Sequence, residues 1–150
     1  MLDTNAFDAL VADESNRVGI VGLTRSGTVS LFTTYVQERE LLVLASVDPH
    51  KYWRTASIPR SALASSVFVL DHTPLGSGRL GAGTAYEAVW LGPKHVDDAV
   101  IADTAKAEDL PVVTNDRRLR RRAEELGLDV WSSAELITWM RTGCRKSQPC

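Results

Sequence analysis

Cysteine and long apolar runs are scarce in this sequence of 150 residues. The two cysteines, Cys144 and Cys150, lie in a polar C-terminal stretch, so no disulfide framework supports a core. No stretch approaches the ~20 apolar residues of a membrane span, and the N-terminus lacks the basic and apolar regions of a signal peptide. We therefore expect a cytoplasmic protein that does not engage a membrane.

An excess of charge of one sign is also lacking. The 17 Lys and Arg residues against 19 Asp and Glu residues give a net charge of −2, so any polyanion must bind a local basic patch. Apolar residues make up 44% and charged residues 24% of the chain, which excludes intrinsic disorder, collagen and a pure coiled coil. We expect one domain over residues 1–142 and a polar, frayed tail over residues 143–150.

Short apolar runs alternate with helical patterns along the chain. Extended segments are predicted at residues 29–33, 67–70, 111–114 and 130–131, and helices at about 35–45, 97–108 and 117–126. Ser132 and Glu135 have the spacing of a capping box that opens a final helix. This alternation predicts an α/β fold, a three-layer α/β/α sandwich with a mostly parallel central sheet. Ligands of such sheets bind beyond the carboxyl ends of the strands.

Four acids lie just after predicted strands or near the starts of predicted helices: Asp3, Glu40, Asp98 and Asp116. In a parallel sheet all four can converge at one edge. On the helix that carries Asp98, the small residues Ala102 and Ala105 share its face and allow a close approach to the sheet, whereas Asp103 lies off this stripe. The pattern therefore predicts an acidic pocket, with Asp103 outside it.

Each acid also has a purely structural interpretation. Aspartate is a favoured helix N-cap, which would account for Asp116 and for Asp97 or Asp98. Asp3 would then be a turn residue and Glu40 a solvated helix position. These structural roles account for each acid taken singly. They account less well for the occurrence of all four acids at such positions.

Four segments, in chain order, resemble motifs of PIN-domain nucleases. Residues 3–5 (Asp-Thr-Asn) look like the opening motif of that family, and residues 34–41 resemble its Thr…Glu-Leu segment, with Glu40 rather than Glu38 as the second acid. Residues 98–105 are similar to its Asp-x-x-Ile-Ala-x-x-Ala helix. Residues 112–116 resemble its apolar strand that ends in Thr-Asn-Asp. The last two motifs are the specific ones.

The resemblance implies a Mg²⁺- or Mn²⁺-dependent ribonuclease that uses one or two ions. Hard divalent cations prefer carboxylate oxygens and water, and no histidine or cysteine falls within the acidic motifs, which disfavours a zinc site. The implied catalytic and metal-binding residues are Asp3, Asp98 and Asp116, with Glu40 orienting a ligand water or completing a second metal site. The implied supporting residues are Asn5, Thr114 and Asn115.

The same resemblance implies a biological setting. Compact proteins of this kind are most often the toxin of a toxin–antitoxin pair. In that setting a small antitoxin protein blocks the acidic cleft, and the nuclease, whose substrate is RNA, is a homodimer.

Five arginines follow Asp116 closely: Arg117, Arg118, Arg120, Arg121 and Arg122. One interpretation is a solvated helix face, on which Arg120 and Arg121 pair with Glu124 and Glu125 outside a buried stripe made of Leu119, Ala123 and Leu126. The helix dipole, however, disfavours cations in the first turn by about 0.3–1 kcal/mol each. We therefore predict that Arg117, Arg118 and Arg120, in or near the first turn, face anions, either the acidic cluster or a phosphate backbone. The predicted nucleic-acid-binding residues are Arg117, Arg118, Arg120 and Arg121.

Residues 76–81 fit the pattern G-x-G-x-x-G, and a helix is possible at residues 84–91. The alternative function is therefore a non-catalytic nucleotide- or nucleic-acid-binding module that uses the Gly76–Gly83 loop. Residues 71–75 separate the preceding strand candidate from the first glycine, where a dinucleotide site requires a tight turn, and no second half-domain follows. A surface loop near the substrate channel is the favoured interpretation.

Overall fold

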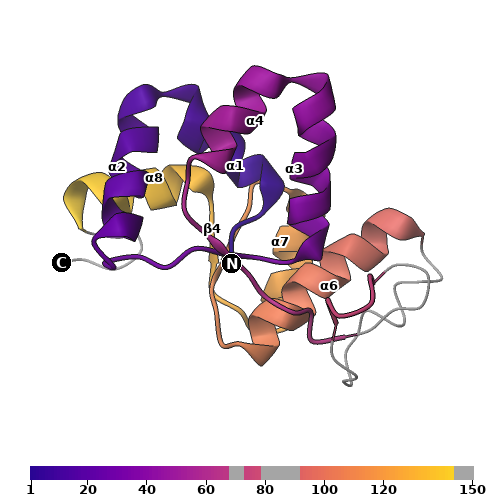
Figure 1. The fold of residues 1–150 in the computed structure, drawn as a ribbon. Helices are drawn as coiled ribbons and strands as arrows, with labels where there is room; N and C mark the ends of the chain where they lie inside the picture. The colour runs from indigo at the N-terminus through magenta and orange to yellow at the C-terminus, as the bar shows by residue number, and fades with distance from the viewer. Residues whose placement is uncertain (68–72, 79–91, 144–150) are drawn as a thin grey trace.

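The structure is a computed structural model, and it describes residues 1–67, 73–78 and 92–143 (Figure 1). Its helices are α1 (Thr4–Ala12), α2 (Glu14–Arg25), α3 (Tyr35–Val47), α4 (Pro49–Ala56), α6 (Pro93–Ala107), α7 (Arg117–Glu125) and α8 (Ser133–Thr142). Its strands are β1 (Phe32–Thr33), β2 (Ser61–Ala62), β3 (Val112–Val113) and β4 (Val130–Trp131). Within these ranges, no helix combines the length and the apolar character that crossing a membrane requires.

The strands form two parallel pairs that the N-terminal segment joins. β1 pairs with β2, and β3 pairs with β4, both in parallel. Between them, the N–H of Leu2 donates to the carbonyl of Phe32 at 2.8 Å, and the N–H of Asp3 donates to the carbonyl of Val113 at 3.0 Å. The hydrogen-bonded order is therefore β2, β1, residues 1–3, β3, β4, which confirms the predicted α/β fold with parallel pairing.

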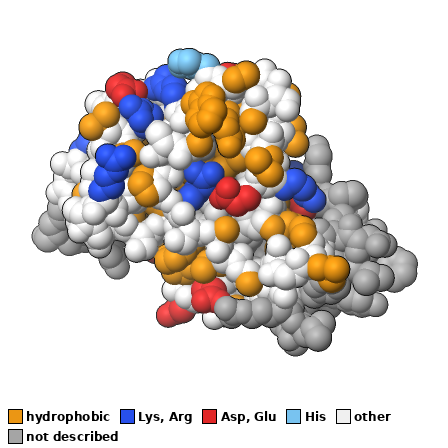
Figure 2. All heavy atoms as spheres, in the orientation of Figure 1, with side chains coloured by type: hydrophobic (Ala, Val, Ile, Leu, Met, Phe, Trp, Pro, Cys, Tyr) orange, Lys and Arg blue, Asp and Glu red, His pale blue; other side chains and the backbone are white. Residues whose placement is uncertain are grey.

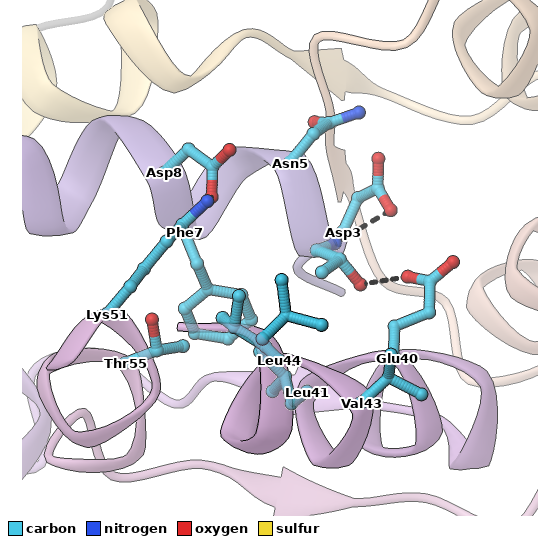
Figure 3. A pocket seen from close by; sticks show the side chains of 12 residues that line it. Asp3, Asn5, Phe7, Asp8, Glu40, Leu41, Val43, Leu44, Lys51 and Thr55 are labelled. Carbon is cyan, nitrogen blue, oxygen red and sulfur yellow. Dashed lines mark hydrogen bonds and ion pairs between the residues drawn. The ribbon is translucent and has the colours of Figure 1, made fainter. Parts of the chain in front are cut away.

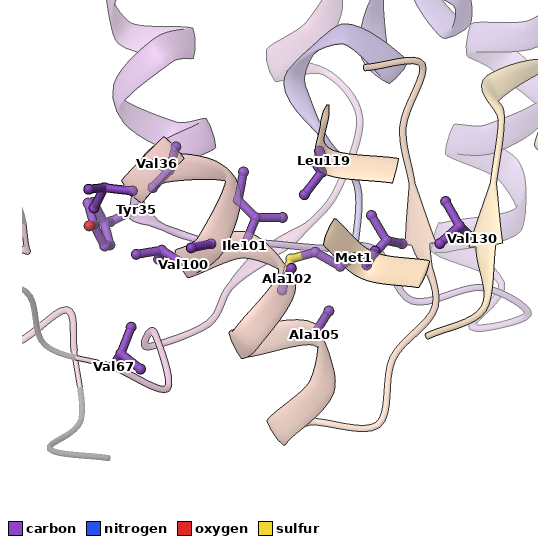
Figure 4. Packing of buried hydrophobic residues seen from close by; sticks show 14 residues of the cluster. Met1, Tyr35, Val36, Val67, Val100, Ile101, Ala102, Ala105, Leu119 and Val130 are labelled. Atoms are coloured by element: carbon purple, nitrogen blue, oxygen red, sulfur yellow. The ribbon is translucent and has the colours of Figure 1, made fainter. Parts of the chain in front are cut away.

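Alternation of side chains along the extended segments divides the core into two clusters. Met1 and Val112 belong to a cluster with the buried residues of α6 and α7, such as Ala102 and Leu119 (Figure 4). The next residues along, Leu2 and Val113, belong to a second cluster with residues of α1, α2 and α8, namely Ala6, Phe7, Leu10, Val11, Ile20 and Leu136. Helices thus cover both faces of the sheet, and the ends of its strands are left for a site.

Several local predictions are confirmed. The strand at residues 130–131 and the capping box of Ser132 and Glu135 are present. Gly127, with φ of 73°, follows the end of α7, and a conformation with positive φ favours glycine. The predicted strands at 29–33 and 111–114 are shorter, each with only two residues in the ladder. The helix predicted at about 35–45 extends to Val47.

One boundary prediction is wrong in a way that matters for the site. The helix predicted from residue 97 begins at Pro93, with Gly92 as its N-cap. Proline is favoured in the first turn because its missing N–H has no helical partner there. Neither Asp97 nor Asp98 is therefore an N-cap, and both lie inside α6.

Four predicted segments fall mainly on residues that the structure does not describe. Val67 is buried outside any strand, and the rest of the predicted strand at 67–70 lies beyond the described residues. The same is true of residues 79–83 of the Gly76–Gly83 loop, of the helix at 84–91 and of the tail after Gly143. Within the described part of the loop, a Cβ on Gly78 would lie 2.6 Å from Cγ2 of Thr73. Close packing therefore accounts for that glycine without a ligand.

Candidate active site

Asp3 lies at the junction of the N-terminal extended segment and α1, where it is the N-cap. Its Oδ1 accepts from the N–H of Thr4 at 2.7 Å, and its Oδ2 accepts from the hydroxyl of Thr114 at 2.6 Å. Burial raises the pKa of Asp3 from 3.8 to about 6, although both hydrogen bonds lower it. The nearby charges of Glu40 and Asp116 raise the pKa of Asp3 further.

Glu40 reaches the same place from α3. Oε2 of Glu40 accepts a short hydrogen bond from the hydroxyl of Thr4, so the residue after Asp3 holds the second acid (Figure 3). Glu38, two positions earlier, turns elsewhere: its Oε1 accepts from Nε of Arg60 at 2.7 Å and from the hydroxyl of Thr33 at 2.7 Å. The structure therefore brings Glu40, and not Glu38, to Asp3.

Asp116 is the N-cap of α7, which confirms that it has the capping role considered from the sequence. Its Oδ1 accepts from the backbone N–H of Arg118 at 2.7 Å and of Leu119 at 3.2 Å. The N–H of Asp116 donates to the hydroxyl of Thr114 at 2.9 Å, and that hydroxyl in turn donates to Asp3. Capping engages one carboxylate oxygen and leaves Oδ2 for other contacts.

Asp98 projects from α6 toward these acids. Its Oδ2 is buried and has no hydrogen-bond partner, and Nε of Arg118 lies 3.8 Å from it. Burial raises the pKa of Asp98 to about 6; Arg118 lowers it, and the charges of Asp116, Asp3 and Asp97 raise it. The small residues predicted to share its face, Ala102 and Ala105, are fully buried.

Side chains of α3 and α6, of Asp3 before α1, and of Asp116 and Arg118 at the start of α7 line one cavity of about 160 Å³, which we call the acidic cleft. Its lining residues are Asp3, Val36, Glu40, Asp97, Asp98, Ile101, Asp116 and Arg118. The structure thus brings together all four acids that the sequence singled out, and Asp103 does not line the cleft. Val36 and Ile101 are buried and supply its apolar part.

Asp97 is the acid that sequence reasoning set aside as a helix cap. Its Oδ1 is buried without a hydrogen-bond partner, and its Oδ2 accepts from Nη2 of Arg39 at 2.9 Å. Pro93 was the available signal, because a helix that starts there places Asp97 in its second turn.

Asn5 and Asn115, two of the predicted supporting residues, belong to a hydrogen-bonded bridge close in sequence to Asp3 and Asp116. The N–H of Asn115 donates to Oδ1 of Asn5 at 2.9 Å. The side chain of Asn115 also donates to the hydroxyl of Ser133 at 2.7 Å and accepts from the N–H of Ser133 at 3.2 Å. These bonds tie the loop between β3 and α7 to α1 and to α8. Sequence reasoning gave Ser133 no such role.

The arginines that follow Asp116 separate into two groups. Arg118 lines the cleft, and its guanidinium lies 3.8 Å from both Asp98 and Asp116. The predicted pairs on the outer face are present, Arg120 with Glu124 at 3.7 Å and Arg121 with Glu125 at 3.6 Å. The stripe formed by Leu119, Ala123 and Leu126 packs into the core, as predicted. Arg117 is exposed.

A second cavity of about 440 Å³, which we call the apolar groove, shares Asp3 and Glu40 with the acidic cleft (Figure 3). Its apolar lining is formed by Phe7, Leu41, Val43, Leu44 and Val47. At the end away from Glu40, Nζ of Lys51 pairs with Oδ1 of Asp8 at 2.7 Å. In the orientation of Figure 1, the space-filling view of Figure 2 shows hydrophobic side chains gathered in the upper part of the molecule, where Figure 1 places α3 and α4.

The chemistry of the acidic cleft fits a hard divalent cation. Its potential ligands are carboxylate oxygens, and one of these, Oδ2 of Asp98, is buried without a hydrogen bond. Among the residues described, no three Asp, Glu, His or Cys side chains converge closely enough to hold one ion by themselves. Mg²⁺ is usually held by one or two carboxylates together with water and substrate phosphate, so this arrangement is compatible with such an ion.

A family model described as a PIN domain matches residues 1–125, which include every residue of the acidic cleft. Neither the curated proteins nor the solved structures give a match.

Proposed function

Because the chain belongs to the PIN-domain family, we propose that it is a Mg²⁺- or Mn²⁺-dependent endoribonuclease that hydrolyses RNA phosphodiester bonds in the acidic cleft. PIN domains are generally metal-dependent nucleases. The observation that carries the proposal is that five acids, the four singled out from the sequence together with Asp97, line a single cavity in which two of them, Asp3 and Asp98, have raised pKa values.

Asp3 and Asp98, with Asp116 and Glu40, are the residues that would hold the ion. A bound divalent cation stabilises charge on the scissile phosphate and lowers the pKa of a water molecule. Burial, and to a smaller extent the like charges of the neighbouring acids, raise the pKa of Asp3 and Asp98. A bound cation would stabilise their charged forms against both effects.

Thr114 and Thr4 orient two of these acids. The Thr114 hydroxyl accepts from the N–H of Asp116 and donates to Oδ2 of Asp3, which fixes the direction of its proton. The Thr4 hydroxyl donates to Oε2 of Glu40 and leaves Oε1 to accept a proton from an attacking water. Glu40 therefore orients or deprotonates that water in our proposal.

Arg118 is the arginine best placed to meet a phosphate. Its side chain is 45% exposed, and its contacts with Asp98 and Asp116, both at 3.8 Å, are too long to be hydrogen bonds. A phosphate oxygen would give it charge-assisted hydrogen bonds that it lacks in the free protein. We propose that Arg117, Arg120 and Arg121 contribute weaker contacts to the RNA backbone further along α7.

The apolar groove supports a polypeptide inhibitor, as in a toxin–antitoxin pair. Three carboxylates, of Asp3, Asp8 and Glu40, against one ammonium, of Lys51, make the groove unfavourable for RNA. An amphipathic segment with apolar residues and a cation would match both its lining and its acidic end. A cation placed beside Asp3 and Glu40 would compete with the metal ion. The homodimer stays a prediction, which the molar mass in solution tests.

Cleavage of RNA tests the proposed nuclease directly. A pool of structured and linear RNAs is incubated with the wild type and with Asp98→Asn, each with Mn²⁺ and with EDTA. We expect cleavage only by the wild type with metal. The matched control is Asp109→Asn, just after the same helix, where φ of 51° suits asparagine as well as aspartate, and it should cleave normally. Equal cleavage by Asp98→Asn, or cleavage in EDTA, would refute the proposal.

A further inference from the structure

An ion pair joins the two helices that carry Glu40 and Asp98. Nη2 of Arg39 on α3 lies 2.9 Å from Oδ2 of Asp97 on α6. The side chain of Arg39 is 49% exposed and that of Asp97 is 19% exposed. Each partner is the immediate chain neighbour of one of the acids of the cleft. The ion pair therefore joins α3 and α6, which form two walls of the acidic cleft, next to Glu40 and Asp98 in the chain.

The helical repeat explains why Arg39 is beside the cleft and not in it. Residues four apart share a face of a helix, and Val36 and Glu40 both line the cleft. Tyr35 and Arg39 form the adjacent row on α3, and the charges of both Arg39 and Asp97 act on the hydroxyl of Tyr35. Tyr35 and Val36, one turn before Arg39 and Glu40, belong to the same buried cluster as Val100 and Ile101 of α6 (Figure 4).

Repulsion among the carboxylates of the cleft opposes the close approach of α3 to α6 and α7. Glu40 on α3 faces the acids on α6 and α7 across a cavity of about 160 Å³. Arg118 lies 3.8 Å from Asp98 and from Asp116, and both of these acids are on its own side of the cleft. Among the ion pairs of the described residues, the bond between Arg39 and Asp97 is the one that links α3 to α6.

We propose that Arg39 and Asp97 are positioning residues whose ion pair holds α3 against α6, so that Glu40 and Asp98 stay on facing walls of the cleft in which a divalent cation would bind. The proposal rests on the proposed function, since it concerns the metal affinity of that same cleft. Residues that orient metal ligands from outside the ligand set change metal affinity by about 10–100-fold when they are replaced.

Replacement of Arg39 distinguishes positioning from simple electrostatics by the sign of the effect. Arg39→Gln removes a positive charge near the cleft, so electrostatics alone would strengthen cation binding. Loss of the link between the helices would weaken it. We expect calorimetric titration with Mn²⁺, in the absence of RNA, to show binding about tenfold weaker than in the wild type. Circular dichroism and thermal unfolding establish that the variant is folded.

Three further variants complete the test. Arg39→Lys retains the ion pair and should bind Mn²⁺ nearly as well as the wild type. Arg39→Gln combined with Asp97→Asn should bind Mn²⁺ as strongly as Asp97→Asn alone, neither more weakly nor more tightly, because Arg39 has lost its partner in both. Arg141→Gln, which removes a bond of 2.8 Å to Asn16 on the opposite part of the fold, should leave affinity unchanged.

The outcomes separate the two proposals. Binding by Arg39→Gln that equals or exceeds binding by the wild type overturns the positioning role and leaves the proposed nuclease standing. A double variant that recovers affinity relative to Asp97→Asn also overturns it, because recovery indicates simple charge balance. If the wild type itself binds no Mn²⁺, the proposed function fails and the positioning role fails with it.

Discussion

The hydroxyl of Thr114 donates to Oδ2 of Asp3 at 2.6 Å, across 111 positions of sequence. The same hydroxyl accepts from the N–H of Asp116 at 2.9 Å. One buried side chain thus connects the first and last acids of the cleft. The end of β3 and the N-terminal extended segment lie side by side, so a threonine at this place can reach both.

This relationship makes Thr114→Val a test of how Asp3 is held. The substitution keeps the shape of the side chain and removes the donor, which leaves a buried carboxylate oxygen without its partner. We expect the free energy of unfolding at neutral pH to fall by about 1–3 kcal/mol, measured by urea denaturation. Cleavage should also require a higher pH, because this hydrogen bond lowers the pKa of Asp3. Thr114→Ser keeps the hydroxyl and should restore both properties; a variant with valine that matches the wild type would contradict the role.

Stability should depend on pH in a direction that the raised pKa values determine. The folded chain, in which Asp3 and Asp98 have pKa values of about 6, binds more protons than the unfolded chain between about pH 4 and pH 6. In EDTA, the contribution of these two groups to the free energy of unfolding therefore falls as pH rises through this window.

Asp98→Asn isolates one of the two groups. Because asparagine carries no charge, this variant should gain stability relative to the wild type by about 1–2 kcal/mol as pH rises from about 4 to 7. Urea denaturation of both proteins in EDTA at several pH values measures the difference. A difference that stays constant, or that shrinks as pH rises, would contradict the raised pKa of Asp98.

Arg118 and Arg121 should differ in their effect on RNA binding. In an Asp98→Asn background, which prevents turnover, Arg118→Gln should weaken binding more than Arg121→Gln, because Arg121 is engaged with Glu125 away from the cleft. Each lost phosphate contact should reduce the slope of log affinity against log salt by about 1. Filter binding at several salt concentrations measures both quantities. Equal effects of the two substitutions would contradict the placement of Arg118 at the scissile phosphate.

Arg118 should also influence the pH dependence of cleavage. Its charge lowers the pKa of Asp98, so Arg118→Gln should move the acidic limb of the pH–rate profile to higher pH. Arg118→Lys keeps a positive charge and should move it less. An acidic limb that does not move in Arg118→Gln would contradict the coupling between these residues.

Features set by neighbouring residues could be predicted from the sequence. The capping box of Ser132, the pairs of Arg120 and Arg121 with the next turn, and the buried stripe of α7 each depend on spacing within one helix. The four acids could be found because each belongs to a short local motif, and the parallel sheet then brings the motifs together. Local sequence patterns and a parallel sheet were therefore sufficient to predict that these four acids lie close together.

Other elements depend on packing that no local pattern indicates. The sequence of α2 contains Gly19, Gly22 and several β-branched residues, which favour helices weakly; contacts of residues such as Ile20 with the second core cluster stabilise it. β2 consists of Ser61 and Ala62, both exposed, so no apolar run marks it. Helix α4, in contrast, carries a local signal in Asp48, its N-cap, which is followed by Pro49.

The bond between Arg39 and Asp97 could not be anticipated for a related reason. Which face of α3 meets which face of α6 is set by the cores of both helices, and sequence alone does not give that rotation. The early start of α6 at Pro93 then decides that Asp97 faces the cleft and does not cap the helix.

The location of a bound Mn²⁺ ion tests the central claim most directly. Crystals grown with Mn²⁺, measured at a wavelength where manganese scatters anomalously, would show where the ion lies. We expect an anomalous peak in the acidic cleft, ligated by the carboxylate of Asp98 and by at least one of Asp3, Glu40 and Asp116, and absent from crystals of Asp98→Asn. Full metal occupancy elsewhere on the protein with none in the cleft would contradict the account.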